Sequence, residues 1–168
     1  MSTERNDDDG PTEVVGLFGS REGVERAIAG LKAAGFADAD LSLLASHESI
    51  EAADKSGRTW KQRLVALVDE LRYEQPLVAS GAIFLAGGPV AATIAAVIGA
   101  AVGGIAVKEV LEEVTATPHT DQFARSIEAG GVILWVRAEA AEREEVAARV
   151  LSENGGTNVH SHRPQAAV

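Results

Sequence analysis

The sequence predicts an α+β fold, specifically a ferredoxin-like split βαβ sandwich interrupted by a Gly/Ala-rich apolar helical hairpin. Two observations carry this prediction. A strand–helix–strand pattern occurs near the start of the 168-residue chain and again near its end. Between the two patterns, residues 75–107 contain no charged side chain. Two such units would give four strands with two helices on one face, and the apolar stretch would be an insertion.

The first pattern follows an acidic start. Residues 1–13 carry five acids against Arg5, without periodic apolar residues, so we expect a disordered, solvating tail. The first half of the domain then covers 14–46. A β-rich run at 14–19 precedes a helix with Ser20 as N-cap and Gly35 as its stop, and a second strand follows at 41–44. The helix has apolar residues at helical spacing, namely Val24, Ala27, Ile28 and Leu31.

The insertion has two parts. Residues 47–75 form a polar linker and an amphipathic helix, whose apolar stripe consists of Trp60, Leu64, Leu67, Val68 and Leu71. Residues 76–114 form the apolar hairpin. Because the Gly-Gly-Pro sequence at 87–89 interrupts a helix, we predict two helical arms, 77–86 and 90–107, the second continuing into an amphipathic end.

The second half of the domain covers 115–162 and repeats the first pattern. A short helix that begins after Thr117-Pro118 carries Phe123 and Ile127. The run 131–136 is the best strand of the chain. The next helix, with Val146, Ala147, Val150 and Leu151, ends at Asn154-Gly155, and a closing strand covers 157–162 before a tail at 163–168.

The second arm has two different sides at 100° per residue. The bulky side consists of Val90, Ile94, Val97, Ile98, Val102 and Ile105. The small side consists of two rows spaced by four residues, Ala91, Ala95, Gly99 and Gly103, and Ala92, Ala96, Ala100 and Gly104. Such a glycine-zipper-like spacing lets two backbones approach closely, and the glycines cost about 1 kcal/mol each in an exposed helix. The small sides are therefore expected to pack together.

Three roles are compatible with this arm. The bulky side meets lipid, or it packs between copies of a soluble homo-oligomer or against a larger complex, or it lies in the core of the domain itself. Length does not decide between them, because 18 residues at about 1.5 Å each span about 27 Å against a hydrocarbon core of about 30 Å. Contact with a membrane or with other copies through 77–107 is the favoured interpretation.

Composition excludes some function classes. The net charge of −10 argues against nucleic acid as a partner. The chain has no cysteine, and its start lacks the basic and apolar regions of a signal peptide, which predicts a cytoplasmic protein, associated with the inner face of the cell membrane. No common hydrolase, metalloprotease or nucleotide-loop motif occurs, so we expect no catalysis and no cofactor.

Two weaker motifs remain. The run from Gly16 to Gly23 lies between a strand and a helix, where a phosphate loop would lie, but its spacing favours an ordinary tight turn. His160 and His162 share one face of the closing strand and are weak candidates for metal ligands, provided that a third ligand is near.

The chain resembles the bacterial general stress and low-temperature-induced protein family. The resemblance rests on the runs Val14–Ile28, Leu31–Phe36 and Asp40–Leu44, on the Gly/Ala-rich insert, and on Ala129–Arg137. It implies a ferredoxin-type domain with a glycine-rich hydrophobic insert, stress-induced, membrane-associated and without catalytic residues. This chain departs from the family in a rather short insert and in the long polar-to-amphipathic stretch 47–73.

Overall fold

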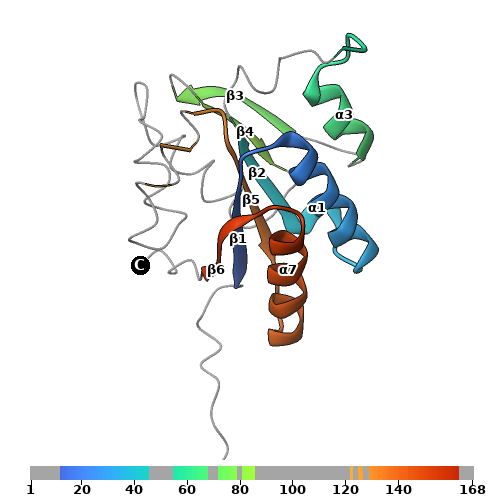
Figure 1. Ribbon diagram of the computed structural model, residues 1–168, viewed down its shortest axis with the longest axis vertical. Helices are drawn as coiled ribbons and strands as arrows, with labels where there is room; N and C mark the ends of the chain where they lie inside the picture. Colours follow the sequence, from blue (N-terminus) through green and yellow to red (C-terminus); the bar gives the residue numbers. More distant parts are fainter. Residues whose placement is uncertain are drawn as a thin grey trace, which may run out of the picture.

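The computed structural model describes residues 12–45, 55–67, 72–78, 81–85, 122, 125–126 and 129–162. The elements in chain order are β1 (Glu13–Phe18), α1 (Arg21–Ala33), the 3-10 helix η1 (Asp38–Asp40), β2 (Leu41–Ala45), α3 (Trp60–Leu67), β3 (Arg72–Val78), β4 (Gly81–Leu85), β5 (Val132–Arg137), α7 (Ala141–Glu153) and β6 (Thr157–His162) (Figure 1). This is the mixed α+β class that the sequence predicts.

The strands form one sheet in the order β3-β4-β2-β5-β1-β6, and every neighbouring pair is antiparallel. The two strands that the sequence analysis identifies most clearly, β1 and β5, are direct neighbours in the middle of the sheet. Strands from the two ends of the chain therefore pair with each other, so the sheet depends on contacts between residues that are far apart in sequence.

The ends of α1 confirm the local signals. The Ser20 hydroxyl accepts a hydrogen bond from the Gly23 backbone N–H at 3.2 Å, which satisfies one of the free donors of the first turn. After the helix, Gly35 has φ of +90°, a conformation that glycine adopts without strain. The predicted apolar stripe, Val24, Ala27, Ile28 and Leu31, is buried. In α7, Ala147 and Leu151 are buried and Val146 and Val150 pack against the same core.

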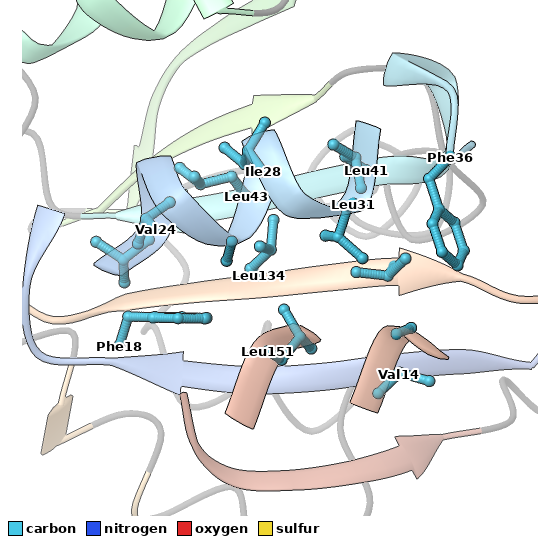
Figure 2. Packing of buried hydrophobic residues seen from close by; sticks show 14 of the residues in the cluster. Val14, Phe18, Val24, Ile28, Leu31, Phe36, Leu41, Leu43, Leu134 and Leu151 are labelled. Carbon is cyan, nitrogen blue, oxygen red and sulfur yellow. The ribbon is translucent and has the colours of Figure 1, made fainter. Parts of the chain in front are cut away.

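The sheet has two faces, because side chains alternate along each strand. We call the first face the one that carries Val14, Phe18, Leu43 and Leu134; these side chains form one core cluster with the buried residues of α1, α3 and α7 (Figure 2). The three helices lie on the same side of the sheet (Figure 1). The second face carries the alternate residues of the same strands, among them Val15, Leu44 and Trp135.

Glycines let α1 and α7 approach closely. A methyl group at Gly23 would lie 2.8 Å from the Asn154 carbonyl oxygen, and one at Gly30 would lie 3.0 Å from Val150 Cγ1. Real side-chain carbons do not tolerate the first of these distances. Close helix packing through small residues, which the sequence predicts for 90–107, is thus observed between α1 and α7.

The first arm of the predicted hairpin is wrong. Of the region predicted as a helix over 77–86, residues 77–78 belong to β3 and 81–85 form β4; these two strands pair with each other and extend the sheet beyond β2. Pro76 lies where the β3–β4 register shifts, between Glu74 and Val78, a place where the missing N–H costs no ladder bond. In a short apolar run, periodicity does not distinguish a helix from a strand. Here the run pairs with the edge of β2 and is extended.

Two boundaries also need correction. Glu13 is the first residue of β1, since its backbone pairs with Arg137 and His162, so it does not belong to the acidic tail. The amphipathic helix is confirmed over Trp60–Leu67, where Trp60 and Leu64 are buried, but Arg72 already begins β3. Residues 46–130 are therefore only partly an insertion, because β3 and β4 belong to the same sheet.

Candidate functional site

The second face of the sheet holds the most unusual group of buried residues. Val15, Leu17, Leu44, Ile133 and Trp135 are each 6% exposed or less, yet none of them belongs to the core cluster of the first face. Antiparallel sheets of this class commonly leave one face in water. In this protein the five side chains are buried, so this part of the second face is not open to water.

Polar residues cross this face at one end. The register places Glu13 of β1 between Arg137 of β5 and His162 of β6. The next row on the same face consists of Ser42, Trp135, Val15 and His160. Glu13 is 1% exposed and Ser42 is 2% exposed. Burial of a charged carboxylate costs several kcal/mol unless hydrogen bonds or opposite charges compensate it, so Glu13 is an unusual residue for the interior of a sheet face.

His160 is held in one orientation. Its Nδ1 lies 2.8 Å from the Asn158 carbonyl oxygen, which only accepts, so Nδ1 carries the proton and donates. Asn158 has φ of +49°, and it is the only residue other than glycine with a positive φ in the described part of the chain. Its Nδ2 donates to Gln122 Oε1 at 3.0 Å. This unusual backbone coincides with the register shift between β1 and β6, which lies between Val15 and Leu17 of β1.

His162 favours its neutral form. Burial of the ring, and secondarily the nearby His160, lowers the pKa of His162 below its ordinary value. The two imidazoles lie on one face of β6, as the sequence predicts, which is the arrangement that two ligands of one metal ion need. Within the ranges that the structure describes, however, no group of three His, Cys, Asp or Glu side chains is arranged to hold a metal ion. The metal hypothesis for His160 and His162 therefore gains no third ligand.

A second polar cluster joins the end of the sheet to α7. Arg137 donates from Nε and Nη2 to Asp40 Oδ1, at 3.0 and 2.8 Å. Arg143 lies 3.8 Å from the other Asp40 oxygen, and its guanidinium stacks 4.0 Å above the centre of the Phe36 ring. The cluster fixes η1, β5 and α7 to one another. Its residues are far apart in sequence, and no local pattern identifies them in advance.

Glu25 fixes α3 to α1. Its Oε1 accepts from Trp60 Nε1 at 3.1 Å, and its Oε2 accepts from Arg63 Nη2 at 2.6 Å. Arg21 lies 5.7 Å from the centre of the Trp60 ring, within the range of a cation–π contact. All of these groups satisfy one another, so this cluster explains how the chain attaches α3 and offers no group for a reaction.

The glycine-containing run before α1 has a structural explanation. The Gly23 N–H is used by the Ser20 cap, and the Gly23 Cα faces the end of α7 at the close distance described above. Gly16 lies beneath Leu151 and Val159, where a methyl group would be 3.3 and 3.4 Å from their side chains. The tight turn and the helix contact account for these glycines, in agreement with the interpretation favoured from the sequence.

The small and bulky sides of 90–107 lie outside the described residues, as do Phe123 and Ile127 of the short predicted helix, although Gln122, Arg125 and Ser126 are helical. Among the helices in the described ranges, none is both long and apolar enough to cross a membrane. Comparisons of the chain with protein-family models, curated proteins and solved structures found no match.

Proposed function

We propose that this chain is a non-enzymatic, stress-related protein that associates with the cytoplasmic side of the cell membrane through the apolar segment 86–107, while its α+β domain stays in water. One observation carries the proposal: in the described part of the chain, the sheet takes up 75–78 and 81–85 of the uncharged stretch 75–107. Residues 86–107 contain no charged side chain and include the two-sided run described above. The resemblance to the stress-protein family supports the same role.

The length of this segment fits contact with a bilayer. As a helix at about 1.5 Å per residue, residues 90–107 would extend over about 27 Å, slightly less than the hydrocarbon thickness of about 30 Å. Its many Ala and Gly residues contribute little to insertion, and the strongly apolar ones give about −2 to −4 kcal/mol. Peripheral or re-entrant insertion is therefore as compatible with the sequence as a full crossing.

The domain itself supports an assignment to the ferredoxin-like type. The order β2-β5-β1-β6, with α1 and α7 on one side, corresponds to the four strands and two helices of a split βαβ sandwich. In this assignment, the β3–β4 hairpin is an addition at the β2 edge, and 86–121 leaves the sheet at the end of β4. The glycine contacts between α1 and α7 then belong to the ferredoxin-like part of the domain and not to the insertion.

Flotation with vesicles of neutral phosphatidylcholine tests the membrane role. Neutral lipid is chosen because the chain carries a net charge of −10 and anionic headgroups would repel it. We expect the full chain to float with the vesicles, and Val97→Asp, which places a charge on the bulky side, to remain at the bottom. Ala141→Asp adds the same charge at an exposed position of α7 and should float normally.

Two outcomes contradict the proposal. If the unchanged chain does not float, membrane association is wrong. If, in addition, light scattering without lipid shows a defined multimer that Gly99→Leu and Gly103→Leu convert to monomer, the small side serves self-assembly, and the soluble scaffold or accessory-subunit function replaces the membrane function.

A further inference from the structure

The second face of the sheet is covered, but not by the helices that build the core. Helices α1 and α7 pack on β1, β5 and β6 from the first face, and α3 packs on α1. Val15, Leu44, Ile133 and Trp135 nevertheless have almost no exposed surface. Apolar side chains of this size are removed from water only by other apolar groups in close contact.

The described residues on either side of 86–121 lie toward opposite edges of the sheet. Leu85, the last residue of β4, pairs with Ser42 of β2. On the other side, Gln122 accepts a hydrogen bond from Asn158 of β6. The strands β2, β5 and β1 lie between β4 and β6, so at about 4.8 Å per strand these two strands are about 19 Å apart in the sheet.

A segment that joins β4 to the β6 side across the sheet has only the second face available, because α1 and α7 occupy the first face. The composition of the crossing segment also fits the second face. Its bulky residues, Val90, Ile94, Val97, Ile98, Val102 and Ile105, are branched aliphatics, and the middle of the face presents branched aliphatics and Trp135. The row with Arg137, Glu13 and His162 lies at one end of the face, and His160 lies in the next row, at the β6 edge.

We propose that the second face of the sheet is the docking surface for the bulky side of residues 90–107 of the same chain when the protein is in water. Trp135 lies in the central row of this surface, between Ser42 and Val15. The proposal concerns the protein without lipid and does not rest on membrane association. It gives the bulky residues a partner within the chain, and vesicle binding would have to compete with that partner.

The chain offers a specific test, because it has no cysteine and only two tryptophans, Trp60 and Trp135. Trp60→Phe leaves Trp135 as the only tryptophan on a protein whose fold is checked by circular dichroism. Single variants Ile98→Cys and Val102→Cys then carry a nitroxide label, which quenches tryptophan at contact. Arg149→Cys, at an exposed position of α7, provides the matched control.

In lipid-free buffer, we expect a label at Ile98→Cys or Val102→Cys to reduce Trp135 emission at least about twofold, because docked side chains lie within contact distance. Reduction of the nitroxide with ascorbate should restore the emission, and the label at Arg149→Cys should leave it unchanged. If neither label in the segment quenches Trp135 while the variants remain folded, the proposal is wrong.

A mixing experiment identifies the occupant. Labelled Ile98→Cys protein that also carries Trp60→Phe and Trp135→Phe has no tryptophan and is added to the unlabelled protein that contains Trp135. Quenching in this mixture would show that a second copy provides the segment, which overturns docking within the chain. Failure of flotation with vesicles would leave these readouts unchanged, so the two proposals fail separately.

Discussion

On the first face of the sheet, each buried side chain meets a helix that the local sequence pattern predicts; on the second face, side chains are equally buried but meet neither α1, α3 nor α7. The buried side chains of the first face form an apolar core cluster, and the helices above it meet through close glycine contacts between α1 and α7. The second face combines buried apolar side chains with polar residues at one end, where Glu13 is buried and His160 and His162 are partly buried. Burial alone therefore does not show how a face is covered.

The largest expected effect compares neighbouring residues of β5 that point to opposite faces. Leu134 and Ile133 are both fully buried, Leu134 on the first face and Ile133 on the second. We expect Leu134→Ala and Ile133→Ala each to lower the free energy of unfolding by about 2–5 kcal/mol, because each removes buried methyl groups and leaves a cavity. Urea unfolding followed by circular dichroism at 222 nm measures both.

The expectation that both faces are equally buried is wrong if Ile133→Ala behaves like a surface substitution. A loss of less than about 0.5 kcal/mol for Ile133→Ala, beside a full loss for Leu134→Ala, would mean that the second face is open to water in solution. In that case the docking of 90–107 would also be wrong, because the surface would have no occupant.

A smaller effect is expected at the contact between α1 and α7. Gly23→Ala places a methyl group 2.8 Å from the Asn154 carbonyl oxygen, so backbone must move, and we expect a loss of about 1–3 kcal/mol. Gly19→Ala is the control, since a methyl group there would have no heavy atom within 4 Å. Thermal unfolding of both variants checks this; equal melting temperatures would show that the helices adjust without cost.

The smallest effect concerns the polar row of the second face. Because the pKa of His162 is lowered in the folded protein, its neutral form is the one that folding favours. The unfolded chain takes up this proton at about pH 6.5, so the stabilising contribution is complete above that pH and is lost as the pH falls below it. His162→Asn should therefore show a shallower loss of stability than the unchanged chain.

Urea unfolding at about pH 7.5 and about pH 5.5 measures this difference, in a range where His is the side chain that ordinarily titrates. Variant and unchanged chain lose stability equally if the histidine is free to become charged in the folded state. That result would indicate that water reaches this end of the second face.

Local sequence signals predicted the regular elements of the domain well where side chains alternate or repeat every turn. Ser20, Gly35 and the stripe of α1 have the roles that their spacing indicates, and β1, β2, β5, α7 and β6 lie where the two βαβ patterns place them. The same signals failed at 77–86, where a ten-residue apolar run is too short to separate helix from strand.

The candidate site was predicted only in part. The position of His160 and His162 on one face of β6 follows from alternation along a strand. Their position on the same face as Glu13, and the pairing of Arg137 with Asp40, depend on strand order and register. Glu13 even carried a misleading local signal, because it follows a run of acids and looked like part of the tail.

Apart from β3 and β4, the sequence by itself determined which of the described residues are helical, which are extended and which side of each element is apolar, since these depend on neighbours within a few positions. Only the tertiary structure decided that β3 and β4 join the edge of β2, that α1 and α7 meet through Gly23 and Gly30, and that the second face is buried. These features arise from contacts between distant segments, whose free energy depends on which surfaces meet and not on the pattern within either segment.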